Sequence, residues 1–256
     1  MPQRYLLGSA ALLVVFLALW EWGPGALGIP RYILPPASRV WASFVEMARD
    51  GTVFTHTGIT MAEVVVGFVL GALLGAVGGY VLGISPTAEF VLSPYILALQ
   101  IAPKVAFAPL FVLWLGFTIY PKILVAILIV FFPILINVLS ALRHIDPDLV
   151  NLARSFKASR AQIFWKIDFP ASMPALFSGL RIGSTLAVIG VVVGELVGGD
   201  QGLGFLLTYG EGSGNTAMVF VSIILLTLVG IVAYVAVIWA ERRVLHYMPP
   251  RAMEAF

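Results

Sequence analysis

The sequence contains no cysteine, and charged residues make up only 11% of its 256 positions. The absence of cysteine excludes disulfides, thiolate metal sites and a cysteine nucleophile. The three histidines lie far apart, and no HExxH, GxSxG or GxxxxGKS/T pattern occurs. Because no catalytic constellation or phosphate-binding loop is present, we expect the chain not to be an enzyme and to bind no cofactor or metal of its own.

Apolar residues are what the sequence has in excess. Hydrophobic side chains account for 60% of it, and its mean hydropathy is +1.00. A soluble domain of this length leaves too much surface exposed to bury so many apolar residues. We therefore predict an integral membrane protein in contact with a lipid bilayer. Basic residues at membrane edges explain the net charge of +2, so no nucleic-acid partner is expected.

Six apolar segments each approach the roughly 20 residues that are needed to cross a bilayer. They are Tyr5–Trp22, Ala62–Ile84, Leu92–Leu115, Lys122–Leu142, Leu176–Val197 and Ala217–Trp239. The first ends in LWEWGPG rather than at a small-residue cleavage site, so it is predicted to be a retained anchor and not a signal peptide. The segments predict an all-α membrane protein with one transmembrane domain over residues 1–256 and a core over about 34–240.

The positions of lysine and arginine predict the orientation in the membrane. With a cytoplasmic N-terminus, nine basic residues lie inside and four outside, while Lys104 and Arg181 fall within spans. The inside set is Arg4, Arg143, Arg154, Lys157, Arg160, Lys166, Arg242, Arg243 and Arg251, and the outside set is Arg31, Arg39, Arg49 and Lys122. This bias predicts that both termini are cytoplasmic.

Shorter features are predicted on the outer side. Ser38–Met47 predicts a short amphipathic helix on the outer surface, and Asp50–Thr60 predicts a polar link into the second span. The run GGDQGLG at Gly198–Gly204 does not lie between a strand and a helix, as a dinucleotide-binding loop would. We interpret it as a flexible outer loop or a re-entrant turn.

Glycines recur at every fourth residue within the second span. They are Gly67, Gly71, Gly75 and Gly79. Glycines at that spacing line one face of a helix and allow another helix to approach closely. We interpret this face as a packing surface within the chain, and a dimer seam is the alternative.

Two charged residues inside or at the end of spans are candidates for a translocation path. Lys104 lies within the third span among several prolines, which break the helical hydrogen-bond pattern. The functional interpretation is a broken helix beside the path, and the alternative is a lysine that reaches the interface along its own stem. Glu195 lies at the outer end of its span and is either a cavity acid or a solvated edge residue.

A polar, basic segment interrupts the apolar sequence at residues 146–170 and reads DPDLVNLARSFKASRAQIFWKIDFP. Asp146 supplies an N-cap ahead of a proline at the first helical position. One apolar face of the resulting helix comprises Leu149, Leu152, Ala153 and Phe156. Ser159 and Gln162 form a capping-box pattern that begins a second helix, and Pro170 limits its extent. The pattern is typical of a plain interfacial loop or of a surface for a cytoplasmic partner.

The stretch LARSFKASRAQIFWKIDFP resembles the cytoplasmic signature loop in permease subunits of bacterial ATP-binding-cassette importers. In that pattern a Glu-Ala-Ala triplet is followed by a glycine, then by a hydrophobic residue and Leu-Pro. The resemblance implies that the residues of this loop that couple to the ATPase are Asn151, Leu152, Ala153, Phe156, Lys157, Ala158, Ile167, Phe169 and Pro170. Asn151 replaces the acidic residue and Lys157 replaces the glycine. If the turn needs a left-handed backbone, Lys157 costs on the order of 1 kcal/mol there.

The resemblance extends from about Leu34 to Tyr234 and favours the nitrate/sulfonate/taurine branch of this family. The matching stretches are Pro103–Ala106, Pro109–Phe111, Trp114–Gly116, Phe131–Ile134 with Asn137, Gly179–Arg181, Gly190–Glu195 and Gly202–Gly204. It implies a type I importer permease fold in the bacterial inner membrane, with segment 146–170 as the coupling helix pair.

The resemblance also implies partners. These are ATPase subunits that hold ATP and Mg, a periplasmic or lipid-anchored solute-binding protein, and a second permease subunit that forms a homodimer or a paired heterodimer. The solute would be a small anion such as a sulfonate, nitrate, taurine or an aromatic acid, with a pyrimidine-type vitamin precursor as the alternative. An ion-driven secondary transporter and a non-transporting scaffold are the rivals, although the paired intramembrane acids and inverted repeats of the former are absent.

Overall fold

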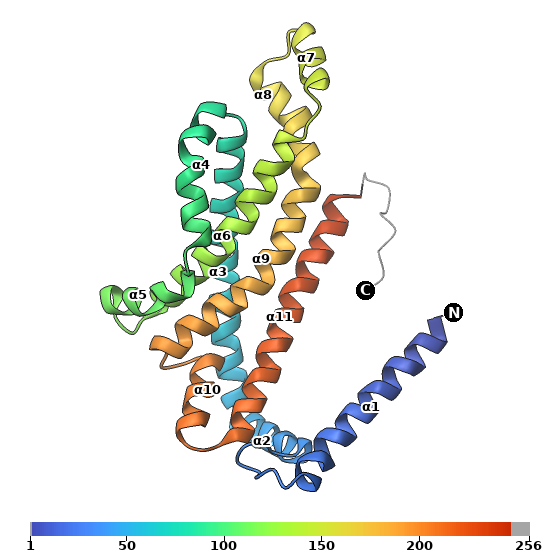
Figure 1. The fold of residues 1–256 in the computed structure, drawn as a ribbon, viewed down its shortest axis with the longest axis vertical. Helices are drawn as coiled ribbons and strands as arrows, with labels where there is room; N and C mark the ends of the chain where they lie inside the picture. Colours follow the sequence, from blue (N-terminus) through green and yellow to red (C-terminus); the bar gives the residue numbers. More distant parts are fainter. Residues whose placement is uncertain (1, 247–256) are drawn as a thin grey trace. The chain divides into compact units, whose positions relative to one another are not determined.

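The computed structural model describes residues 2–246, and every regular element within that range is helical (Figure 1). The elements are α1 (Pro2–Ala26), α2 (Ala37–Arg49), α3 (Thr52–Gly83), α4 (Pro86–Ile101), η1 (Lys104–Phe107), α5 (Ala108–Leu115), α6 (Ile119–Arg143), α7 (Pro147–Ser155), α8 (Arg160–Ile163), η2 (Phe164–Asp168), α9 (Phe169–Gly198), α10 (Leu203–Gly212) and α11 (Thr216–Val244). The predicted all-α fold class is confirmed. Arg251, counted above as cytoplasmic, lies outside the described residues.

Within the described residues, five helices are long and apolar enough to cross a membrane, and the remaining predicted span is broken. Its two parts, Pro86–Ile101 and Lys104–Leu115, are bent by 82° relative to one another. The span predicted over Leu92–Leu115 therefore consists of two helices that meet at a bend. Pro103 has no N–H to donate to the preceding turn, and a short 3-10 helix, η1, follows it. Of the two interpretations of Lys104, the structure confirms the broken helix, and its place beside a translocation path stays a prediction.

The chain forms two compact units. One consists of Met1–Thr60 and Gly199–Leu228, and the other of Met61–Gly198 and Val229–Phe256. The boundary falls within two helices, because α3 and α11 each run from one unit into the other. A single transmembrane domain over residues 1–256 stays a prediction.

The core of the larger unit is formed by α6 and α9, which pack against each other along most of their length. The side chains of α6 that are fully shielded from solvent include Val125, Ala126, Val130, Ile134 and Val138. Both helices are long and apolar enough to cross a membrane.

The glycine face of α3 packs against α6 in the same unit. A Cβ atom added at Gly67 would lie 2.6 Å from Cβ of Ala126, and one at Gly75 would lie 2.6 Å from the Phe131 carbonyl oxygen. Real Cβ atoms do not approach so closely, so glycine is required for the two backbones to come together. The predicted packing surface is confirmed, and the alternative of a dimer seam on this face is wrong because α6 occupies it.

We expect Gly190→Ala to lower the stability of the larger unit by about 1–3 kcal/mol, since the added methyl overpacks a crossing of two helices. Its Cβ would lie 2.6 Å from Cα of Ala126 on α6. Gly230→Ala is the matched control, because the nearest atom to its Cβ is 4.0 Å away. We expect the control to be neutral or slightly stabilising, as Gly→Ala is in open helix positions. Thermal unfolding in detergent measures both, and equal midpoints would contradict the prediction.

In the smaller unit, α10 begins against the first turns of α3. The Gly202 N–H donates to Nδ1 of His56 at 3.0 Å, and the Leu203 N–H donates to Oγ1 of Thr60 at 2.8 Å. The prediction of a polar link over Asp50–Thr60 is therefore wrong. These residues are helical from Thr52, and their polar side chains hold the start of α10. Of the GGDQGLG run, only residues 199–202 are non-helical, and Gly202 needs its positive φ of 105° to begin α10.

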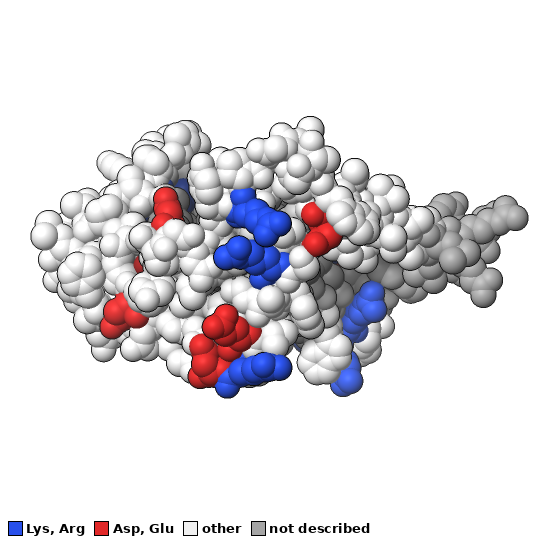
Figure 2. Space-filling model, turned by 90° about the horizontal axis from the view of Figure 1, so that it is seen from below, with Lys and Arg blue, Asp and Glu red and all other residues white. Residues whose placement is uncertain are grey.

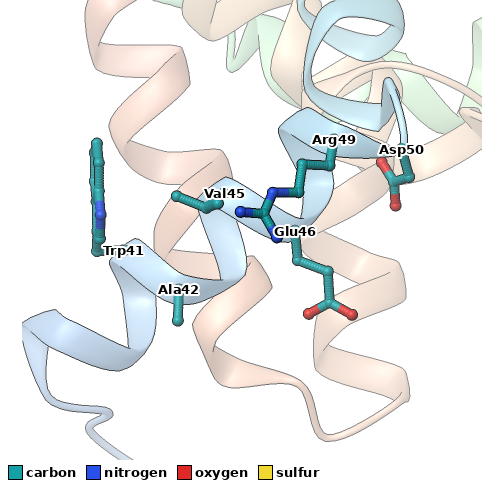
Figure 3. A pocket seen from close by; sticks show the side chains of 6 residues that line it. All are labelled: Trp41, Ala42, Val45, Glu46, Arg49 and Asp50. Atoms are coloured by element: carbon teal, nitrogen blue, oxygen red, sulfur yellow. The ribbon is translucent and has the colours of Figure 1, made fainter.

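The predicted amphipathic helix at Ser38–Met47 is confirmed as α2. Val40 and Met47 are buried, while the rings of Trp41 and Phe44 stack with centroids 5.3 Å apart. A shallow hollow follows one face of α2 and is lined by Trp41, Ala42, Val45, Glu46, Arg49 and Asp50 (Figure 3). It is lined by one helix and the residue after it, so it is a surface feature and not a binding cavity.

Charges near this helix are of both signs. Asp50 accepts a hydrogen bond from the Thr52 backbone N–H at 2.9 Å, and this bond lowers the pKa of the Asp50 carboxyl below its ordinary value. In Figure 2, acidic and basic side chains are scattered in small groups among uncharged residues, and an acidic group at the bottom of the view adjoins a basic one.

Candidate coupling segment and translocation residues

The polar segment at residues 146–170 folds as the sequence predicts in its first half. The Asp146 carboxylate accepts a hydrogen bond from the Asp148 N–H at 2.9 Å and caps α7. Leu152 and Phe156 are 55% and 79% exposed, so the apolar side of α7 is not covered by the described residues of this chain. A capped helix with an exposed apolar face is suited to insertion into a groove on another protein.

Lys157 adopts the left-handed conformation that the turn between α7 and α8 requires. Its φ is 60°, and it is the single non-glycine residue with positive φ among those the structure describes. The Lys157 N–H donates to the Arg154 carbonyl at 2.8 Å, and the Ala158 N–H donates to the Ala153 carbonyl at 3.0 Å. This bond pair is the Schellman motif that usually ends in glycine. The turn therefore keeps the shape that a glycine would give it, and the lysine bears the strain.

We expect Lys157→Gly to preserve coupling and to stabilise the turn by about 1 kcal/mol, because glycine adopts this conformation without the steric penalty of a Cβ atom. Lys157→Val should have the opposite effect and destabilise the turn, since a β-branched residue is least tolerant of positive φ. Uptake and ATP hydrolysis in proteoliposomes, together with thermal unfolding, measure both variants. A loss of transport-coupled ATP hydrolysis in Lys157→Gly would show that the lysine itself has a role.

The second half of the segment differs from the prediction. The capping box is confirmed: the Ser159 N–H donates to Oε1 of Gln162 at 2.8 Å, and the Gln162 N–H donates to Oγ of Ser159 at 3.3 Å. The helix that starts there does not end at Pro170, however, but continues from Arg160 to Gly198. A π-helical turn, η2, precedes the proline, and the wider turn makes room for a ring that would clash with the preceding carbonyl in a regular α-helix.

The nine coupling residues therefore occupy three environments. Asn151, Leu152 and Phe156 are exposed on or just after α7, while Lys157 and Ala158 form the turn. Ile167, Phe169 and Pro170 are partly buried at the base of the long helix. Only the first group, with Ala153 partly exposed beside it, forms an outward surface. The last group belongs to the junction with the membrane-spanning part of α9.

Lys104 lies at the bend of the broken span. Its Nζ donates to the Gln100 carbonyl at 2.5 Å and to the Ala102 carbonyl at 3.5 Å, and it lies 4.9 Å from the ring centroid of Phe132. The ammonium thus neutralises the carbonyl end of α4, where the helix dipole is negative. These contacts fit two roles for Lys104: attraction of an anionic solute, and stabilisation of the bend between α4 and η1.

Glu195 is fully buried on α9 and is not a solvated edge residue. Its neighbour Gly194 packs against Lys122 of α6, which is 4% exposed. Lys122 donates to Oε1 of Glu63 on α3 at 2.9 Å. Lys122, counted above among the outer basic residues, is therefore a buried, paired lysine, and the side of the membrane on which it lies stays a prediction. Phe132, beside Lys104, lies ten residues beyond Lys122 on α6, about 15 Å along the axis, so the structure does not bring Lys104 and Glu195 together.

Sequence reasoning missed the buried pair of Glu63 and Lys122. A signal was present, since each residue lies at the start of a predicted apolar span that begins on the outer side. Opposite charges at the same depth are expected to pair, because an isolated charge within a membrane is costly. Among the described residues, no group of three His, Asp or Glu side chains is arranged to hold a metal ion.

Long apolar helices, a bent span and a capped helix pair that leads into a 39-residue apolar helix are features expected of a membrane permease. The family model described as "Binding-protein-dependent transport system inner membrane component" matches residues 67–246, and the chain belongs to that family. It is a multi-pass inner-membrane permease subunit of an ATP-binding-cassette importer. The predicted class of protein is confirmed.

Several relatives match nearly the whole chain. The riboflavin transport system permease protein RibX of Chloroflexus aurantiacus is 36% identical over 92% of this chain and 88% of its own length. The formylaminopyrimidine transport permease protein ThiX of Halalkalibacterium halodurans is 32% identical over 88% of this chain and 89% of its own length. The aliphatic sulfonates transport permease protein SsuC of Bacillus subtilis, described as putative, is 33% identical over 91% and 84%.

A solved structure shares the fold. A chain of the MetNI methionine ABC transporter, in an inward-facing conformation, aligns with a TM-score of 0.57 and 20% sequence identity. The alignment covers 75% of this chain and 94% of that one. The predicted type I importer permease fold is confirmed by this likeness, which concerns the fold alone.

Proposed function

We propose that two permease subunits of this kind enclose the solute path and that segment 146–170 couples the path to ATP hydrolysis on separate ATPase subunits. The observation that carries the proposal is the exposed apolar face of α7, with Leu152 and Phe156 next to a fixed turn. A flexible interfacial loop would need neither the N-cap on α7 nor the capping box on α8. Both caps fix the helix pair as a rigid surface.

The partners follow from membership of the importer family. ATPase subunits supply ATP and Mg, and a solute-binding protein delivers solute at the outer side. In this proposal the permease pairs with a second copy of itself. The α5 part of the bent third span leaves apolar side chains such as Leu113 and Trp114 exposed, which supports such a contact. Spans three to five line the path. The proposal includes a cytoplasmic location for both termini, which the distribution of lysine and arginine supports.

Two classes of solute are favoured. A small anion is suggested by Lys104 and by the sulfonate relatives, while a ring-containing vitamin or vitamin precursor is suggested by the riboflavin and formylaminopyrimidine relatives. Binding measurements on the solute-binding protein that works with this chain separate the two. Tight binding of a sulfonate, taurine, nitrate or aromatic acid would support the first class, and tight binding of a neutral pyrimidine would support the second.

The coupling proposal is tested by co-expression with the candidate ATPase subunit and reconstitution in liposomes. We expect the two chains to co-purify and the loaded solute-binding protein to stimulate ATP hydrolysis. Uptake driven by an ion gradient without ATP would identify a secondary transporter instead. Co-purification without any uptake would identify a scaffold.

The orientation can be tested cleanly because the chain has no cysteine. Ser155 in α7 and Trp41 in α2 are both exposed, so each can be replaced by a single cysteine that a reagent can reach. In intact cells we expect an impermeant maleimide to label the Trp41→Cys variant and not the Ser155→Cys variant. The reverse pattern would place the coupling segment outside and would refute the docking role.

Lys104 is tested by Lys104→Ala with Lys104→Arg as the control that keeps the charge. If the ammonium attracts an anionic solute, Lys104→Ala reduces uptake of that solute at low concentration, and Lys104→Arg retains most of it. Unchanged uptake and apparent affinity in Lys104→Ala would show that the lysine does not influence the solute.

A further inference from the structure

We propose that Tyr80 is a positioning residue for coupling, because its side chain ties the junction below the helix pair of α7 and α8 to the membrane-spanning helix α3. The inference rests on the proposed coupling function and assigns one route by which movement of the helix pair reaches the solute path. Tyr80 and its contacts all lie in the larger unit.

The junction lies in a part of the long helix that lacks two regular backbone hydrogen bonds. Pro170 and Pro174 carry no N–H, so the α-helical hydrogen bonds to the carbonyls of Lys166 and Pro170 cannot form. The turn before Pro170 is π-helical, and the Phe169 N–H donates to the carbonyl of Phe164, five residues back. Prolines and π-turns are the places where helices bend. Residues 164–174 are therefore a joint between the outward helix pair and the membrane-spanning part of α9.

Tyr80 contacts this joint through a hydrogen bond and two rings. Its hydroxyl lies 2.8 Å from Oγ of Ser172, which is fully buried. The Ser172 hydroxyl donates its one hydrogen to the Phe169 carbonyl at 3.0 Å, so Tyr80 is the donor to Ser172. The Tyr80 ring centroid lies 5.5 Å from that of Phe164, edge on, and 5.8 Å from that of Phe169. Such aromatic contacts add to the packing of the junction.

The position of Tyr80 on α3 makes the tie effective. The preceding residue, Gly79, packs directly on α6, and its Cβ would lie 2.8 Å from that of Val138. Four residues later, Gly83 packs on Leu142 in the same way. This end of α3 therefore cannot slide freely along α6. A displacement of the joint that reaches Tyr80 is passed to α3 and α6 together, instead of being absorbed by bending at Pro170.

Tyr80→Phe removes the hydroxyl and keeps the ring, so it tests the tie without opening a cavity. In proteoliposomes with the ATPase subunits and loaded solute-binding protein, we expect solute uptake per ATP hydrolysed to fall about three- to tenfold, as for loss of one hydrogen bond in a two-state equilibrium. Basal ATP hydrolysis and the KM for ATP should stay unchanged, because the ATPase sites are on another chain. A purely structural defect would instead lower all activities in proportion to folded protein.

Two further variants sharpen the result. Ser172→Ala removes the same hydrogen bond from the other side, so it should lower the coupling ratio to a similar extent, and the double variant should lower it no further. Ser184→Ala is the matched control, since Ser184 is buried on α9 and its hydroxyl donates to the Arg181 carbonyl of its own helix. If wild-type protein couples and Tyr80→Phe or Ser172→Ala couples equally well, the inference is overturned while the proposed function stands. Absence of solute-stimulated hydrolysis in the wild type would instead refute the proposed function.

Discussion

Phe156→Ala is expected to weaken binding of the ATPase subunits by about 30- to 900-fold and to abolish uptake. The Phe156 side chain is 79% exposed, so its removal costs this chain little folding energy. If its ring fills a groove on the ATPase, truncation removes an aromatic anchor, which typically costs about 2–4 kcal/mol of binding. Leu152, also exposed on α7, would make a smaller contribution to the same contact.

Affinity of the detergent-purified permease for immobilised ATPase subunits measures this effect. Phe117→Ala is the matched control. Phe117 is 73% exposed, like Phe156, but it follows α5 at the end of the broken span and is not part of segment 146–170. We expect the control to bind within twofold of the wild type. ATPase binding that survives Phe156→Ala and a further Leu152→Ala would show that α7 is not the docking element.

The second large effect is expected from Lys122→Met, which leaves Glu63 with a buried negative charge. The two side chains are 5% and 2% exposed and joined at 2.9 Å. Breaking a buried pair from one side costs about 3–5 kcal/mol, because the remaining charge keeps its desolvation penalty without the compensating attraction. We expect a sharp fall in folded yield and in the midpoint of thermal unfolding.

A double-mutant cycle with Glu63→Leu identifies the cause. The double variant should lose less stability than the sum of the two single variants. With both charges of the pair removed, neither is left buried without its partner. Lys166→Met, at an exposed lysine, should change stability by no more than about 0.5 kcal/mol. Additive losses in the cycle would mean that the pair contributes nothing beyond its two separate side chains.

Local features of the coupling segment could be predicted from the sequence, whereas its continuation into the membrane could not. Asp146, Ser159 and Gln162 form their caps with residues two or three positions away, so the pattern contains all the partners. Pro170 was expected to end a helix, and the π-turn before it was not foreseen. That turn is stabilised by packing of Phe164 and Phe169 on Tyr80, which is more than 80 residues distant, and no local rule contains such a contact.

The same distinction applies to charges. The broken span at Lys104 was predicted because three prolines surround it in sequence. The pairing of Glu63 with Lys122 depends on how α3 and α6 cross, and the glycine spacing predicted that α3 approaches another helix but not which one. The strain at Lys157 was foreseen only as a condition, since the sequence does not say which conformation the turn adopts.

The 82° bend after Ile101 has a consequence for how the protein assembles. Irregular backbone is not tolerated against lipid tails, where its polar groups find no water, so the bend must be covered by protein or line an aqueous space. A solitary subunit in a bilayer would meet neither condition fully. Its folding and its association are then one linked equilibrium, and apparent stability should rise with the protein-to-lipid ratio. Subunits at a low protein-to-lipid ratio should therefore unfold faster than the same subunits at a high ratio.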